Sequence, residues 1–170
     1  QTQPLKQRFP NNDEFYEKLV SRDVYNDKSC GYMLMKLENL KRKKEKISVL
    51  GVVTEGAGVT IEHILPQNPR LPDCWRKALG ENWQDKQKEN VNRLGNLTIT
   101  QSNSEMSDNC FVDKKRIALD QSSYLLSDYF KDLTTWDEKN IETRTEELAQ
   151  NALKVWKYPN LPDEIVNKYV

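Results

Sequence analysis

Two segments of this sequence combine β-branched residues with the turn signals that bound a strand. Residues 59–65 (VTIEHIL) stop at Pro66, and residues 93–100 (RLGNLTIT) begin with a glycine turn. β-Branched residues favour strands, and glycine and proline mark their ends. The two strands are expected to pair as a small antiparallel hairpin. We therefore predict an α+β fold, a mostly helical domain with the hairpin inserted around residues 59–105.

Apolar residues recur at helical spacing on both sides of this insert. Helices are predicted at about 12–20, 31–46, 73–79, 110–119 and 135–158. Their predicted N-caps are Asn12, Asp73 and Asn109, with Thr135 and Glu138 as a capping box before the last helix. The single domain, 1–170, thus has a helical surround at 11–47 and 110–158 and a core at about 52–120.

Composition limits the class of protein. The chain has 170 residues, a formal net charge of +0 and a mean hydropathy of -0.85, with no apolar run long enough to cross a bilayer. Neutrality argues against a nucleic-acid coat but allows an enzyme that meets nucleic acid over a small patch. The chain begins with Gln rather than Met, which predicts an excised fragment or a processed product.

The cysteines are few and widely spaced. Cys30, Cys74 and Cys110 form no CxxC pair, which argues against a structural zinc site. An odd count without a secretory signal favours reduced thiols. We therefore expect three free thiols and a cytoplasmic protein.

The chain has a single histidine, His63, preceded by Glu62. One imidazole excludes the two-histidine zinc motifs. It leaves mechanisms in which histidine is a base and oxygen atoms hold any metal ion. Neighbouring strand residues point to opposite faces, so Glu62 and His63 can share a site only at a strand end or an irregularity. Pro66 makes a strand end plausible.

Asparagines complete the candidate site. The amide oxygen of Asn103 is a hard ligand that suits Mg²⁺ as Glu62 does, and Asn109 is the alternative ligand. Asn96 is expected to hold the loop that carries His63 or to fix its tautomer. From the residues alone, His63 is equally a packed strand residue, Asn96 a turn residue, and Asn103 and Asn109 helix caps.

These motifs also resemble a known family. IEHILPQ, LGNLTITQSNSEMSD and NCFVDKK resemble the nuclease found at the C-terminal end of GmrSD-type modification-dependent restriction enzymes. They are similar, more loosely, to the HNH nuclease domain of RNA-guided CRISPR effectors. Segments around the motifs, YMLMKLE among them, extend the first resemblance over most of the chain.

The resemblance implies a role for each candidate residue. It implies a ββα-metal (His-Me finger) fold with His63 as general base, supported by Asn96. It implies that Glu62 and Asn103 bind Mg²⁺ or Mn²⁺, and that Lys114 and the adjacent Lys115 contact DNA phosphates. An exposed helix lysine is the alternative for Lys114.

The resemblance also implies partners. These are double-stranded DNA, modified phage DNA included, and an N-terminal nucleotide-hydrolysing, DNA-sensing domain outside this chain, which implies that the chain is the excised C-terminal part of a longer bacterial protein. The implied activity is endonuclease cleavage in anti-phage restriction. Rival hypotheses are a non-catalytic DNA-binding or regulatory module, an RNA-cleaving nuclease, and an interaction domain of a defence complex that exposes some of its four tryptophans.

Overall fold

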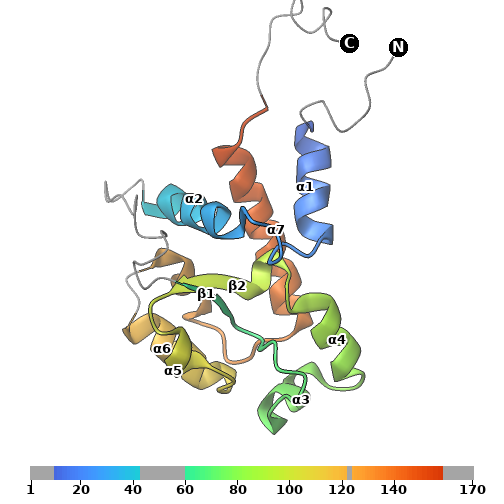
Figure 1. Cartoon of the computed structure of the whole chain (residues 1–170), viewed down its shortest axis with the longest axis vertical. Coiled ribbons are helices and arrows are strands. Elements are labelled where there is room, and N and C mark those ends of the chain that lie inside the picture. Colours follow the sequence, from blue (N-terminus) through green and yellow to red (C-terminus); the bar gives the residue numbers. More distant parts are fainter. Residues whose placement is uncertain (1–9, 43–59, 122–123, 159–170) are drawn as a thin grey trace, which may run out of the picture.

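The computed structural model describes residues 10–42, 60–121 and 124–158. Figure 1 shows a mostly helical molecule with one small sheet near its middle, in agreement with the predicted α+β class. The elements in chain order are α1 Asn12–Ser21, α2 Cys30–Arg42, β1 Thr60–His63, α3 Asp73–Leu79, α4 Trp83–Asn90, the 3-10 turn η3 Leu94–Asn96, β2 Leu97–Thr100, α5 Asn103–Met106, α6 Phe111–Asp120, the 3-10 turn η4 Leu125–Phe130, and α7 Glu138–Val155.

The two predicted strands pair as expected. β1 and β2 are antiparallel, and the register runs from Thr60 opposite Thr100 to His63 opposite Leu97. Their connection, residues 64–96, is long and carries α3, α4 and η3. α5 and α6 follow β2 directly and lie on one side of the sheet (Figure 1). The segment 51–58 (GVVTEGAG), whose glycines and paired valines predict a turn or short strand, lies outside the described residues.

Four predicted helix N-caps are wrong by one or two positions. Asn11, not Asn12, caps α1 and forms a capping box with Glu14. The box before α7 is formed by Asp137 and Asn140. For α1 the choice has a clear reason, because Glu14, three positions after Asn11, returns a hydrogen bond to the cap's own backbone, whereas Phe15, three positions after Asn12, has no group that could do so.

The third wrong cap is Asn109. Cys110 is the N-cap of α6, without a side-chain hydrogen bond, and Asn109 instead donates to the Glu105 carbonyl of α5. The fourth is Asp73, which is the first residue of α3 rather than its N-cap; Pro72 is the N-cap, without a side-chain hydrogen bond, and Gly80 ends the helix with a positive φ of 69°. Glycine accepts that left-handed conformation because it has no Cβ.

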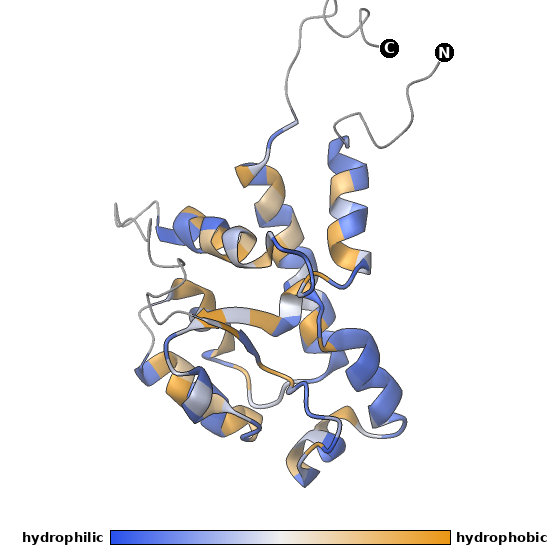
Figure 2. Ribbon diagram, viewed as in Figure 1, coloured by the Kyte–Doolittle hydropathy of each residue, from blue (hydrophilic) through white to orange (hydrophobic). Residues whose placement is uncertain are grey.

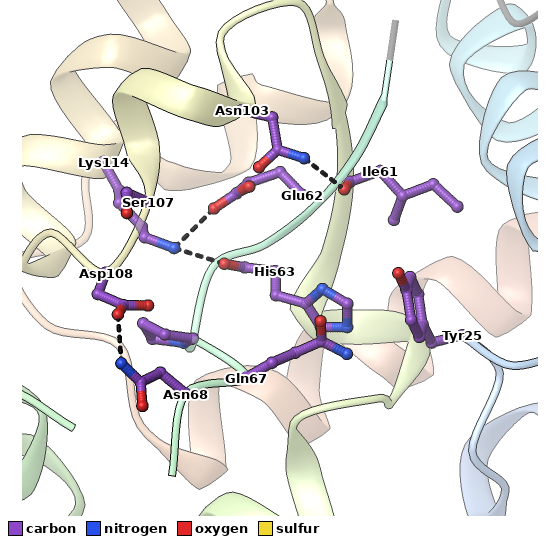
Figure 3. A pocket seen from close by; sticks show the side chains of 11 residues that line it. Tyr25, Ile61, Glu62, His63, Gln67, Asn68, Asn103, Ser107, Asp108 and Lys114 are labelled. Carbon is purple, nitrogen blue, oxygen red and sulfur yellow. Dashed lines mark hydrogen bonds and ion pairs between the residues drawn. The ribbon is translucent and has the colours of Figure 1, made fainter. Parts of the chain in front are cut away.

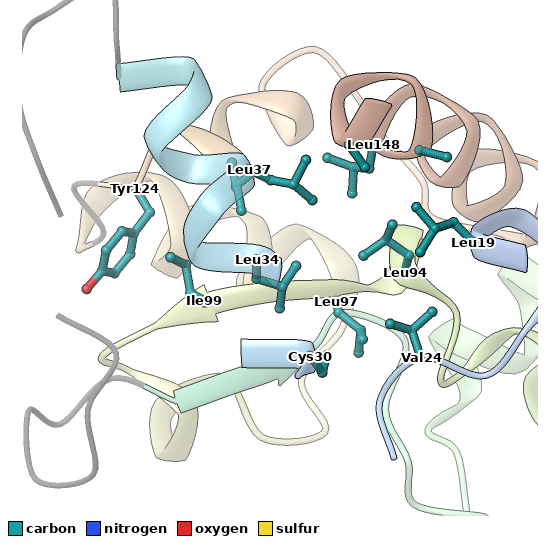
Figure 4. Close-up of a cluster of buried hydrophobic side chains, with 13 residues drawn as sticks. Leu19, Val24, Cys30, Leu34, Leu37, Leu94, Leu97, Ile99, Tyr124 and Leu148 are labelled. Atoms are coloured by element: carbon teal, nitrogen blue, oxygen red, sulfur yellow. The ribbon is translucent and has the colours of Figure 1, made fainter. Parts of the chain in front are cut away.

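Two apolar cores hold the elements together. The first packs α1, α2 and the C-terminal half of α7 over β2, with Leu34, Leu97 and Leu148 among its buried side chains (Figure 4). The second lies around α3, α6 and η4 and is centred on Trp75, Phe130 and Trp136. Figure 2 shows the matching pattern: α1 and α2 are amphipathic, and α4 is almost wholly hydrophilic.

The tryptophans do not form an exposed surface. Trp75 and Trp136 are buried, and Trp83 and Trp156 are half-buried against the cores. The residues that recur at helical spacing along α7 face the core, because Ile141, Leu148, Ala149 and Ala152 are all buried and Trp156, its C-cap, is half-buried. Among the described residues, no helix is long and apolar enough to cross a membrane.

α7 also fixes the turn before β2. The carbonyls of Gly95 and Leu97 accept hydrogen bonds from the buried guanidinium of Arg144, at 2.6 and 2.9 Å. A Cβ built on Gly95 would lie 2.1 Å from the Ile141 carbonyl oxygen, so only glycine fits against α7. These contacts hold the backbone of residues 95–97 against α7.

The prediction of three free thiols is wrong. Cys74 and Cys110 form a disulfide, with their Cα atoms 6.0 Å apart, and Cys30 is a buried free thiol. The disulfide ties α3 to the start of α6. The two cysteines are 36 positions apart in the sequence, and that spacing alone does not show whether their Cα atoms come close enough for a bond. A hydrogen bond from the Trp75 indole to the Asn109 carbonyl supports the same junction.

Candidate functional site

A polar pocket of about 190 Å³ lies at the end of β1 where it faces α5 and α6 (Figure 3). Strand β1 and the loop after it form one wall, and the α5–α6 segment forms the other. The lining residues are Tyr25, Ile61, Glu62, His63, Pro66, Gln67, Asn68, Asn103, Ser107, Asp108 and Lys114. The pocket therefore gathers segments that are far apart in the sequence.

Glu62 and His63 both line this pocket. His63 is the last residue of β1, and the chain turns away from the sheet after it. Both are almost buried, with exposed fractions of 4% and 6%. Because His63 ends the strand, two neighbouring residues can border one cavity. This is the strand-end arrangement that a shared site for Glu62 and His63 needs.

His63 is held by a side chain that the sequence did not single out. Its Nε2 atom lies 3.1 Å from Oδ1 of Asn92, and the Tyr25 ring packs on the imidazole at 4.3 Å between centroids. Burial lowers the pKa of His63 to about 4. The imidazole is therefore neutral at neutral pH and has a lone pair with which to accept a proton.

Glu62 is paired with Lys114. The Lys114 ammonium lies 2.6 Å from Oε1 of Glu62 and also donates to the His63 carbonyl at 2.6 Å. Burial raises the pKa of Glu62 and lowers that of Lys114, and each partner's charge opposes the effect on the other. Lys114 is 1% exposed, so it is not a surface lysine.

Asn103 borders the pocket and Asn109 does not. The Asn103 amide nitrogen donates to the Ile61 carbonyl at 3.3 Å, and its side chain lies beside Glu62 in Figure 3. The Asn109 amide donates away from the pocket, to Glu105. Of the two candidate ligands, geometry thus brings only Asn103 to Glu62 and His63.

Asn96 lies behind the pocket rather than in its lining. It is fully buried, and its amide bonds both the N–H and the C=O of Leu65, at 2.7 and 2.9 Å. It also donates to the Val91 carbonyl and accepts from the Trp136 indole. Its contacts hold the loop that follows His63, and it makes no hydrogen bond to the imidazole.

Lys115 is separate from the pocket. Its ammonium donates to the carbonyls of Lys131 and Leu133, both at 2.8 Å, and so joins α6 to the segment after η4. The structure does not place it with His63.

Several residues of the site had no signal in the sequence. Asp23 and Tyr25 come from the connection between α1 and α2, and Asn92 precedes the glycine turn by a few residues. Asp108 lines the pocket and accepts a hydrogen bond from Asn68 at 2.6 Å. Polar residues in loops are common, and only the fold shows which of them meet.

The pocket's donor atoms suit a hard divalent cation. Glu62, Asn103 and Asp108 supply carboxylate and amide oxygens, which Mg²⁺ prefers. Within the three described ranges, no three His, Cys, Asp or Glu side chains cluster as a metal site would. An ion here would thus take few protein ligands, as Mg²⁺ does, and would compete with Lys114 for Glu62. The oxygen atoms of the pocket therefore suit a hard divalent cation, provided that the cation displaces Lys114 from Glu62.

The fold and the pocket define an α+β domain with a buried histidine beside carboxylate and amide oxygen atoms. Residues 9–151 match the family model of the C-terminal domain of GmrSD restriction endonucleases. Because the match covers most of the 170 residues, the chain belongs to this family. No curated protein and no solved structure matches it. Membership implies a nuclease domain whose substrate is DNA.

Proposed function

We propose that this domain is an HNH-type, metal-dependent endonuclease that hydrolyses DNA phosphodiesters. The observation that carries the proposal is the meeting of His63, Glu62 and Asn103 in one pocket of a restriction-endonuclease domain. In this proposal, β1, β2 and α6 form the ββα unit of a His-Me finger. Their order in the chain and the position of His63 at the end of β1 support it.

His63 is the general base. A water molecule in the pocket gives a proton to the imidazole as its oxygen attacks the phosphorus atom. The P–O bond to the leaving sugar oxygen then breaks, and that oxygen takes up a proton from solvent. The neutral state of His63 supports this role, because a protonated imidazole could not accept the proton.

Glu62 and Asn103 are the proposed ligands of Mg²⁺ or Mn²⁺. The bound ion would supply positive charge to the pentacovalent phosphate and to the leaving oxygen. Lys114 holds the Glu62 carboxylate in place at 2.6 Å and borders the same pocket, where it can meet a phosphate. Lys115, held by two carbonyls, is the weaker of the two proposed phosphate contacts.

Asn96 is proposed to support the base from behind. Its two hydrogen bonds to Leu65 fix the backbone two residues after His63. Loss of the Asn96 amide would therefore release the loop that begins after His63. Asn96 thus acts on catalysis through position rather than by contact with substrate.

The biological setting follows from the family alone. We propose that the domain is the nuclease part of an anti-phage, modification-dependent restriction system in the bacterial cytoplasm. Its substrate would be double-stranded DNA, including modified phage DNA. A nucleotide-hydrolysing, DNA-sensing domain would precede it and select the target.

Metal-dependent cleavage of plasmid DNA tests this proposal. The protein should nick or cut the plasmid with Mg²⁺ or Mn²⁺ and stop when EDTA is added. Asn103→Ala should raise the Mg²⁺ concentration needed for half-maximal cleavage, and the control Asn109→Ala should leave it unchanged. Cleavage that persists in EDTA, or that favours a matched RNA over DNA, would overturn the proposal.

A further inference from the structure

We propose that Asp23 and Asn92 are positioning residues that hold His63 in the tautomer with its proton on Nε2. The inference rests on the proposed role of His63 as base, and it states which ring nitrogen takes the proton. It concerns a chain of three side chains that runs from the α1–α2 connection through the segment before η3 to the pocket.

The orientation of the Asn92 amide follows from its neighbours. Its Nδ2 atom lies 3.0 Å from a carboxylate oxygen of Asp23, and its Oδ1 atom lies 3.3 Å from the amide nitrogen of Gln67. A carboxylate can only accept a hydrogen bond and an amide nitrogen can only donate one. The reversed amide would therefore place its oxygen against the Asp23 carboxylate, so this contact fixes the orientation, and Gln67 donates to Oδ1 in agreement with it.

This orientation decides the tautomer of His63. The Asn92 oxygen that faces Gln67 is also the atom 3.1 Å from Nε2 of His63. Because an amide oxygen only accepts, Nε2 must carry the hydrogen that is donated to it. The other ring nitrogen, Nδ1, then holds the lone pair. Nδ1 is thus the atom that receives the proton of the attacking water.

The backbone makes Asn92 a rigid support. Its carbonyl oxygen accepts hydrogen bonds from the N–H groups of Val24 and Tyr25, at 3.0 and 3.3 Å. The next residue, Arg93, donates to the Val20 carbonyl at the end of α1 at 2.7 Å. Residues 91–93 are therefore fastened to the segment that supplies Asp23.

The same segment limits the rotation of the imidazole. Tyr25 packs on the His63 ring at an interplanar angle of 70°. Asn92 holds one nitrogen of the ring while Tyr25 restricts its tilt, so both the direction and the tautomer of His63 depend on residues 23–25. The connection between α1 and α2 thereby contributes directly to the position of the His63 ring.

The experiment is nitrogen-15 NMR of histidine-labelled protein at neutral pH. The chain has a single histidine, so the two imidazole nitrogens belong to His63 without ambiguity. Couplings to the ring protons assign Nδ1 and Nε2, and the chemical shift of each shows whether it is protonated. We expect Nε2 as the N–H nitrogen. A spectrum with the proton on Nδ1 would overturn the inference whether or not the protein cuts DNA.

Substitutions test the support itself. Asn92→Leu should give a mixture of the two tautomers and lower kcat for DNA cleavage by about tenfold or more, with little change in KM. Asn151→Leu, on the distant part of α7, is the matched control and should change neither. Unchanged tautomer populations in Asn92→Leu would overturn the proposal.

A charge exchange guards against misfolding of Asn92→Leu. Asn92→Asp alone places a second carboxylate against Asp23 and should disturb His63. Combining it with Asp23→Asn lets an amide N–H face the new carboxylate, which still accepts from Nε2. The double variant should recover the Nε2–H tautomer and most of kcat. Failure of this rescue in a folded double variant would contradict the relay, whereas absent cleavage by the wild type would reject only the proposed function.

Discussion

The Lys114 ammonium lies 2.6 Å from the Glu62 carboxylate inside the pocket, and both side chains are almost completely buried. The pair couples α6 to the end of β1 and gives the candidate metal ligand an internal counterion. A divalent cation bound at Glu62, as proposed, would therefore compete with Lys114 for the same carboxylate.

Lys114→Met should reveal this competition. Loss of the ammonium leaves a buried carboxylate unpaired, which costs about 3–5 kcal/mol in the free energy of unfolding. Mg²⁺ should then raise Tm more in the variant than in the wild type, because it no longer displaces Lys114. Thermal unfolding with EDTA and with Mg²⁺ measures both effects.

Lys115→Met is the control for this experiment. It removes only two hydrogen bonds to backbone carbonyls and should show the same Mg²⁺ response as the wild type. Equal Mg²⁺-induced shifts in Lys114→Met and the wild type would mean that no cation binds at Glu62.

The Cys74–Cys110 disulfide should contribute strongly to stability. It closes a loop of 36 residues, for which the chain-entropy model gives about 4 kcal/mol. Reduction should therefore lower the wild-type free energy of unfolding by an amount of that order. Cys74→Ser should start from the lower value and be insensitive to reductant. Urea unfolding with and without reductant measures this, and a wild type that ignores the reductant would refute the bond.

Titration of His63 should make the free energy of unfolding fall as the pH is lowered. Burial lowers its pKa to about 4 in the folded protein, against about 6.5 in an unfolded chain. The unfolded state thus binds the proton first as pH falls. His63 contributes fully above pH 6.5, and about 3 kcal/mol is lost between there and pH 4.

His63→Gln isolates this contribution. Gln can still donate to Asn92 but does not titrate, so the difference between the two unfolding free energies cancels the other ionisable groups. The wild type should lose stability relative to His63→Gln on acidification. A constant difference from pH 7 to pH 4 would mean that His63 titrates normally in the folded state.

The sequence predicted the local pattern well and the tertiary contacts poorly. The strands around His63 and Asn96, the breaks at Pro66 and Gly80, and the apolar face of α7 follow from periodicity and turn chemistry. These signals are local, because each depends on residues within one or two turns of chain.

What was missed depends on contacts between distant segments. Cys74 meets Cys110 only because α3 packs at the start of α6, and Asp23 reaches His63 only through Asn92. Lys114 lies inside the pocket because α6 turns that face toward β1, which no hydrophobic pattern around it indicates. His63, the single histidine, does line the pocket together with Glu62 and Asn103, and whether this pocket is the functional site stays a prediction.

Cleavage of supercoiled plasmid by His63→Ala in saturating Mg²⁺ measures whether His63 is the general base, on which the whole proposed mechanism depends. The account predicts a folded protein, with a near wild-type circular dichroism spectrum, whose nicking rate falls by about 10²-fold or more because the base is gone. A folded His63→Ala protein that cuts at the wild-type rate would contradict the account.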